Sequence, residues 1–98
     1  MELEEEVIKR IKEDEDLFKE RFKVREIGVF GSVVRGEGTE KSDIDIIVEF
    51  ESEGKNFDNY VELKFFLEEL LGASVDLVSK SAIKERLKSK ILEEVVFL

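Results

Sequence analysis

The stretch that decides the fold spans residues 30–50 and reads FGSVVRGEGTEKSDIDIIVEF. Its second half, Ser42 to Phe50, predicts a β-strand because isoleucine and valine, both strong strand formers, dominate it. Successive side chains of a strand point to opposite faces, so Asp43 and Asp45 share one face, about 6.6 Å apart along the chain. The apolar side chains that alternate with them point into the core: Ile44, Ile46 and Val48.

The paired aspartates predict a site for divalent cations. Two carboxylates held side by side repel each other and disfavour the fold unless a cation lies between them. Hard oxygen ligands select magnesium, manganese or calcium. The pair therefore suits a two-metal site, in which ions about 3.5–4 Å apart hold the attacking and leaving oxygens of a displacement. The alternative is a polar strand edge that faces water, and the strongly apolar residues around the aspartates disfavour it.

The glycine and serine near the start of the stretch predict a phosphate-binding turn. Gly31-Ser32 follows a strand and precedes Val33 to Arg35, a segment long enough for one or two helical turns. Glycine lets the backbone approach an anion closely, and N–H groups at a helix start attract phosphate. Arg35 lies about one turn later and can reach a phosphate or a carboxylate. Taken alone, Gly-Ser also fits an ordinary turn with a serine cap. The ten residues from 33 to 42 then allow the turn to present a triphosphate to the metals.

A third carboxylate is expected on an adjacent strand, because two residues cannot fill the inner shell of two metals. The candidate is Asp76, a lone acid inside the apolar segment Val75 to Val78, and acids are poor strand formers. The alternative is a solvent-facing residue of an alternating strand, which explains the same pattern. Glu49 shares the face of Asp45 but lies further along the strand, so we expect it outside the metal shell.

The remaining residues predict a small α/β (α+β) domain. Apolar residues at helical spacing predict an amphipathic helix from Leu3 to Phe22 and another from about Asp58 to Leu71, which Gly72 ends. The other predicted elements are a strand at Val24 to Phe30, a polar loop at Glu51 to Lys55, a strand at Val75 to Val78, and a last helix capped by Ser81 and carrying Ile83, Leu87, Ile91, Leu92 and Val95. This order favours one domain over residues 1–98, a small mixed β-sheet with helices packed on one face.

Composition excludes several classes of function. The chain has 98 residues with no Cys and no His, which excludes thiolate and histidine metal sites, cysteine nucleophiles and serine–histidine–aspartate catalysis. The formal net charge of −9 disfavours direct binding to nucleic acid and suits a basic protein partner. The sequence has no apolar run of membrane-spanning length and begins with an acidic amphipathic segment instead of a signal peptide, so we expect no membrane partner and a cytoplasmic location.

The spacing of these motifs matches a known family. Gly31-Ser32, ten intervening residues and then Asp43-x-Asp45 resemble the signature of the DNA polymerase beta-like nucleotidyltransferase superfamily. The string from Phe30 to Phe50 is similar to the core of its minimal nucleotidyltransferase (MNT) group, and the resemblance extends over essentially the whole chain. It implies a nucleotidyltransferase fold and magnesium-dependent transfer of a nucleotidyl group with release of pyrophosphate.

The same resemblance implies roles for the site residues. Asp43 and Asp45 bind the metal ions, and Asp76 completes the site and takes the proton of the acceptor hydroxyl. Gly31 and Ser32 hold the triphosphate. Arg35 supports the loop.

The resemblance also implies a partner. Members of the MNT group are commonly encoded beside a HEPN-domain protein, and the pair resembles a toxin–antitoxin system in which the HEPN protein is a ribonuclease toxin. This chain would then be the antitoxin, a protein adenylyltransferase that adds AMP from ATP to a tyrosine of its partner. The alternative is a non-catalytic antitoxin that neutralises the toxin by binding it. Transfer to a small molecule is a third possibility, disfavoured because the chain has no separate acceptor domain.

Overall fold

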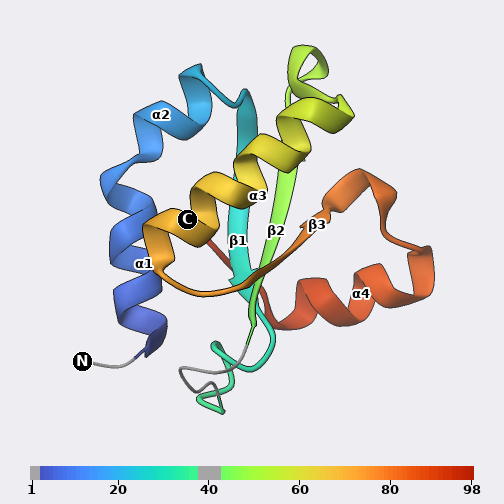
Figure 1. Cartoon of the computed structure of the whole chain (residues 1–98). Helices are drawn as coiled ribbons and strands as arrows, with labels where there is room; N and C mark the ends of the chain where they lie inside the picture. Colours follow the sequence, from blue (N-terminus) through green and yellow to red (C-terminus); the bar gives the residue numbers. More distant parts are fainter. Residues whose placement is uncertain (1–2, 38–42) are drawn as a thin grey trace.

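The computed structural model describes residues 3–37 and 43–98 (Figure 1). Its helices are α1 (Leu3–Glu13), α2 (Glu15–Glu20), α3 (Phe57–Leu71) and α4 (Glu85–Glu94), with short 3-10 helices η1 (Ser52–Gly54) and η2 (Lys80–Ala82). Its strands are β1 (Val24–Phe30), β2 (Ile44–Phe50), β3 (Val75–Ser79) and β4 (Val96–Phe97). The predicted start of the second strand, Ser42, lies outside the described residues.

The strands form one mixed sheet in the order β3-β2-β1-β4. Strand β1 pairs antiparallel with both β2 and β4, whereas β2 pairs parallel with β3. A parallel pair requires a long crossover connection, and α3 provides it between β2 and β3. The predicted α/β fold with a small mixed sheet is therefore confirmed.

The core lies between one face of the sheet and the helices α1 to α3, which cover that face (Figure 1). Ile44, Ile46 and Val48 of β2 point into it and are at most 2% exposed. The helices contribute Val7, Ile11, Phe18, Leu63 and Leu67. Because side chains alternate along a strand, the residues between the core positions of β2 and β3 lie on the other face of the sheet.

Helix α3 agrees closely with its prediction because both of its ends are specified locally. The side chain of Asn56 accepts a hydrogen bond from the Asn59 N–H at 2.8 Å, which caps the first turn. Gly72 ends the helix in the left-handed conformation (φ 65°), and its N–H donates to the Glu68 carbonyl at 2.9 Å. With 15 residues, α3 is the longest helix in the described ranges, none of which contains a helix long and apolar enough to span a bilayer.

The predicted continuous helix from Leu3 to Phe22 is wrong, because the chain breaks at Asp14 into α1 and α2. Asp14 adopts φ −108° and ψ 21°, and its carbonyl accepts from the Phe18 N–H at 3.1 Å as α2 begins. The Asp14 side chain makes no capping hydrogen bond, so the break is a change of backbone conformation without a side-chain cap. Both helices still bury apolar residues, so the predicted amphipathic character holds even though the continuity does not.

The predicted last helix begins later than expected. Ser81 belongs to η2 and caps no helix, since α4 starts at Glu85 without a side-chain cap. Beyond α4, the two residues of β4 pair with β1. This strand escaped prediction because the sequence continues the helical spacing as far as Val95. The predicted polar loop at Glu51 to Lys55 contains the short helix η1.

Candidate active site

Asp45 of β2 and Asp76 of β3 lie side by side on the sheet. The parallel pairing makes each the register partner of the other. Both alternate with core residues, so both lie on the sheet face opposite to the core. Asp43 comes directly before β2 and is exposed. The structure thus brings the two strand aspartates together and places the third predicted aspartate two residues before one of them.

The charges of these aspartates act on one another. The pKa of Asp45 is raised above its usual range, first because its carboxyl is partly buried and then because Asp76 and Asp43 carry like charge nearby. Arg35 opposes this shift but does not cancel it. The site therefore concentrates negative charge, a condition that a bound cation relieves.

The described side chains do not form a ready-made metal cage. Within residues 3–37 and 43–98, no group of three Asp or Glu side chains has the geometry to hold a metal ion. The pairing of Asp45 with Asp76 and the exposure of Asp43 agree with this. The structure therefore shows an adjacent pair of carboxylates with Asp43 near enough to raise the pKa of Asp45, and not the predicted convergence of all three.

Gly31 lies directly against the Asp45 carboxylate. The β1–β2 register pairs Phe30 with Asp45, which brings the next residue beside this side chain. A Cβ atom at residue 31 would lie 2.0 Å from Asp45 Oδ2, closer than any side chain can accept. The backbone also has φ +76°, a left-handed conformation that favours glycine. Glycine is thus required here for two independent reasons.

The segment after Gly31 forms consecutive turns across residues 31–36. The Arg35 N–H donates to the Gly31 carbonyl at 3.1 Å and the Gly36 N–H to the Val33 carbonyl at 3.3 Å. The predicted short helix at Val33 to Arg35 is therefore reduced to a single helical turn that does not continue. Ser32, half-buried, lies in the same turn. The remaining part of the connection to β2, residues 38–42, lies outside the described residues.

Glu94, at the end of α4, is a site residue that the sequence analysis missed. Its Oε1 accepts a hydrogen bond from the Gly31 N–H at 3.0 Å. Arg35 Nη1 donates to both Glu94 oxygens at 3.1 Å, while its Nε donates to Glu37 Oε2 at 3.0 Å. The hydrogen bonds to Glu37 and then to Glu94 raise the pKa of the exposed Arg35 guanidinium. Arg35 thus anchors the turn to α4, and its predicted nucleotide contact stays a prediction.

Two residues of α3 hold the strand that carries Asp76, and the sequence analysis missed both. The Tyr60 hydroxyl donates a hydrogen bond to the Leu77 carbonyl, and Glu68 Oε2 accepts one from the Val75 N–H at 3.0 Å. These contacts occupy backbone groups on the free edge of β3. Burial raises the pKa of Tyr60, and the nearby charge of Asp76 raises it further. Tyr60 is the only tyrosine of the chain, which was a signal available in the sequence.

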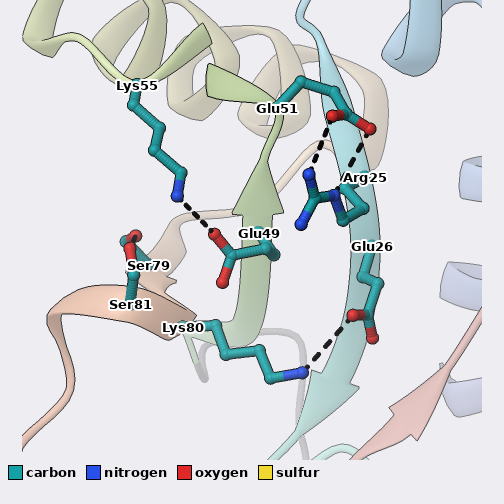
Figure 2. Close-up of polar contacts among 8 residues, drawn as sticks. All are labelled: Arg25, Glu26, Glu49, Glu51, Lys55, Ser79, Lys80 and Ser81. Carbon is teal, nitrogen blue, oxygen red and sulfur yellow. Dashed lines mark hydrogen bonds and ion pairs between the residues drawn. The ribbon is translucent and has the colours of Figure 1, made fainter.

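The far end of the same sheet face carries a cluster of ion pairs (Figure 2). Glu49 lies four residues beyond Asp45 on β2, and its Oε1 is 3.4 Å from Lys55 Nζ. Lys80 and Glu26 approach to 3.4 Å beside this pair. Arg25 and Glu51 form a two-bonded pair at 3.0 and 3.4 Å. Glu49 therefore has a cationic neighbour of its own, and its expected place outside the metal shell stays a prediction.

The fold and the site define a nucleotidyltransferase. The family model described as "Nucleotidyltransferase domain" matches residues 5–98, and the chain belongs to this family. Within the family, the chain is similar to the protein adenylyltransferase MntA of Thermococcus cleftensis, with 54% identity over 80 residues that cover 82% of this chain and 80% of the relative.

Solved structures agree with this assignment. A structure assigned to the minimal nucleotidyltransferases superposes with a TM-score of 0.82 at 39% identity, covering 100% of this chain and 97% of the other. A toxin–antitoxin structure with AMP-PNP superposes with a TM-score of 0.69 at 26% identity, covering 96% of this chain and 70% of that one. The predicted resemblance to minimal nucleotidyltransferases is confirmed, and so is the prediction that the chain is an enzyme of the nucleotidyltransferase class.

Proposed function

We propose that this chain transfers AMP from ATP to a tyrosine hydroxyl of a HEPN-domain ribonuclease toxin and acts as the antitoxin of that protein. The observation that carries the proposal is the juxtaposition of Asp45 and Asp76 on adjacent strands, with Gly31 packed against the Asp45 carboxylate. The similarity to a protein adenylyltransferase and to a toxin–antitoxin structure with AMP-PNP supports the direction of the reaction and the kind of partner.

The chemistry of the donor set suits magnesium, although the described side chains do not form a ready-made cage. Asp43, Asp45 and Asp76 offer only carboxylate oxygens, the ligands that hard divalent cations prefer. The raised pKa of Asp45 reflects burial and like charge, and a bound cation would relieve this repulsion. When held there, two magnesium ions would supply Lewis-acid stabilisation of the phosphates and of the departing pyrophosphate.

In the proposed reaction, the acceptor oxygen attacks the α-phosphorus of ATP. A new O–P bond forms, and the bond between the α-phosphorus and the oxygen bridging to the β-phosphate breaks, so pyrophosphate leaves with the bonding electrons. The acceptor proton passes to Asp76, the carboxylate beside Asp45 on the adjacent strand. Gly31 and Ser32 hold the triphosphate close to the carboxylates, and Arg35 keeps their turn in place through Glu94.

The charge of the chain supports a protein acceptor. A net charge of −9 repels nucleic acid and favours an encounter with a basic protein surface. An RNA-cleaving toxin needs such a basic surface to bind its own substrate. ATP and the RNA that such a toxin cleaves both belong to the cytoplasm, so the proposed reaction is a cytoplasmic one.

The test is transfer of label from α-labelled ATP with magnesium to the HEPN-domain protein of the same source. Wild type is expected to label the partner, and the Asp43→Asn/Asp45→Asn variant is not. Replacement of the modified tyrosine by phenylalanine should abolish labelling, and omission of magnesium should do the same. If the double substitution leaves labelling unchanged, the proposal is contradicted. If the label is found on a residue other than tyrosine, the proposed acceptor residue is wrong.

Neutralisation by binding alone is the second candidate, and the large negative charge of the chain favours it. Co-expression of the toxin with the Asp43→Asn/Asp45→Asn variant separates the two. Catalytic neutralisation predicts that cells carrying the variant stop growing. Growth equal to that with wild type would instead mean that complex formation is sufficient.

A further inference from the structure

The outer side of α3 carries large apolar residues that no other part of the described structure covers. Phe57 is 76% exposed and Phe65 is 62% exposed. Val61 lies between them, partly exposed, so the three residues recur at every fourth position and form one stripe along the helix. The buried residues of the same helix, Leu63 and Leu67, face the core on the other side. Exposed aromatic residues gathered in this way are typical of interaction surfaces.

Acidic residues border this stripe along one side. Asp58, Glu62 and Glu69 are all exposed, and the helical period places them together next to Phe65. None of them takes part in an ion pair within residues 3–37 and 43–98, although seven such pairs occur there. The outer side of α3 therefore combines an apolar centre with a negative border.

We propose that this α3 surface, formed by Phe57, Val61 and Phe65 with the acidic border, docks the HEPN-domain partner through an apolar pocket that lysine or arginine residues surround. The inference rests on the proposed function, because it takes its partner from there. Aromatic anchors supply the binding energy, and the charged border steers the approach. A second copy of the chain fits less well, since two acidic borders and two net charges of −9 would meet. Nucleic acid is repelled by the same charge.

The docking surface and the candidate active site lie on opposite sides of the sheet. Helix α3 covers the core face (Figure 1), whereas Asp45 and Asp76 lie on the other face. A partner held on α3 leaves the carboxylates open to an acceptor hydroxyl. Holding the partner and modifying it are therefore separable by substitution.

The experiment measures the dissociation constant between the purified chain and the HEPN-domain protein of the same source by calorimetry, without ATP. The test variant is Phe57→Ala/Phe65→Ala, and we expect its affinity to fall about tenfold or more, as for truncation of aromatic anchors. The control Leu87→Ala removes an exposed apolar residue (48% exposed) from α4 and should bind as wild type does.

The charged border is tested with the matched pair Asp58→Lys/Glu62→Lys on α3 and Glu85→Lys/Glu93→Lys on α4, where both acids are also exposed. The α3 pair should weaken binding and reduce its dependence on salt, and the α4 pair should change both less. Circular dichroism must match wild type for every variant, which the exposure of these side chains predicts.

The outcomes separate this inference from the proposed function. If Phe57→Ala/Phe65→Ala binds the partner as wild type does, or if Leu87→Ala weakens binding equally, the α3 surface is wrong. The HEPN-domain protein would still be the partner. No binding by wild type would overturn both the partner and the surface. Dimers of wild type that Phe57→Ala/Phe65→Ala converts to monomers, seen by light scattering, would assign the surface to a second copy and overturn the inference.

Discussion

The carboxylates at the two ends of the sheet face opposite the core have different neighbours. We call the end with the ion pairs of Figure 2 the far end, and the end with Asp45 and Asp76 the near end. At the far end, Glu26, Glu49 and Glu51 each have a lysine or arginine within 3.4 Å (Figure 2). At the near end, Asp45 and Asp76 lie opposite each other, and neither forms an ion pair with a residue in the described ranges. The nearest arginine in this region, Arg35, is bonded to Glu37 and Glu94 instead.

Among the described residues, the near end therefore lacks the lysine and arginine partners that the far end has. An exposed ion pair such as Arg25–Glu51 contributes at most about 1 kcal/mol, so this pair adds little to the stability of the fold. Carboxylates left together on the same face, one of them with a raised pKa, instead suit a cation that comes from solution.

The largest effect should come from substituting Asp76. Asp76→Asn is expected to lower AMP transfer by about a hundredfold to a thousandfold, because the amide can neither accept the acceptor proton nor carry charge to a metal. The matched control is Glu49→Gln on the same face, which should keep activity within about twofold because the ion pair that it loses with Lys55 lies four residues from Asp45 on β2. Initial rates with labelled ATP measure both. Equal losses of activity in Asp76→Asn and Glu49→Gln would contradict a functional difference between the two ends of this sheet face.

The next largest effect should come from the glycines of the turn. Gly31→Ala places a methyl group against the Asp45 carboxylate, so we expect loss of most transfer activity together with loss of stability. Gly36→Ala is the matched control, since it has nearly the same φ (+75°) but no atom within 4 Å of the added Cβ. Gly36→Ala should destabilise the fold only through the strain of an alanine in the left-handed conformation, by about 1 kcal/mol. Urea unfolding and transfer rates measured side by side distinguish the two. Equal activity in both variants would contradict a role for the contact between Gly31 and Asp45.

A smaller effect is expected at the anchor of the turn. Glu94→Ala removes the acceptor of the Gly31 N–H and of Arg35, and we expect about a tenfold loss of kcat/KM, mainly through a higher KM for ATP. Glu94→Gln keeps one acceptor oxygen and should recover part of that loss. Glu93→Ala, an exposed neighbour, serves as control. A loss confined to kcat, or an equal loss in Glu93→Ala, would argue against a positioning role.

The smallest effect concerns stability without metal. A carboxyl whose pKa is raised by folding stabilises the fold only when protonated, and this contribution is lost as pH rises from about 4, the usual aspartate value, through the raised value. Asp45→Asn should therefore raise the Tm of the metal-free protein at pH 7, on the order of 2 °C, and leave it unchanged at pH 3. Magnesium should raise the Tm of wild type but not of the variant. If Asp45→Asn had a lower Tm than wild type at pH 7, the raised pKa of Asp45 would be contradicted.

The parts of the molecule that could be predicted from sequence are those that neighbouring residues specify. Alternation alone put Asp45 on a different face from Ile44 and Ile46, and a glycine at position 72 marked the end of α3. The break at Asp14 was missed because the apolar spacing of α1 and α2 is compatible with one continuous helix. Local periodicity reports which side of an element is buried better than it reports where the element ends.

The parts that could not be predicted depend on residues far apart in the chain. Glu94 contacts Gly31 across 63 positions, and nothing near Glu94 distinguishes it from the exposed Glu93. Tyr60 contacts the Leu77 carbonyl only because the fold packs α3 beside β3. Strand β4 has two residues and exists only by pairing with β1. The roles of Asp43, Ser32 and Asp76 in catalysis stay predictions until the substitutions are measured.

The bond between the Gly31 N–H and Glu94 couples the turn to the most loosely held helix. Helix α4 has no fully buried residue, so among the described helices we expect it to detach and re-dock most readily. Each detachment would release the Gly31 amide to solvent, while β1 and β2 keep their pairing. The Gly31 amide should therefore exchange its hydrogen at the rate of the α4 amides and faster than the other amides of the sheet. Local opening of residues 85–94 would then set how long the turn stays ordered.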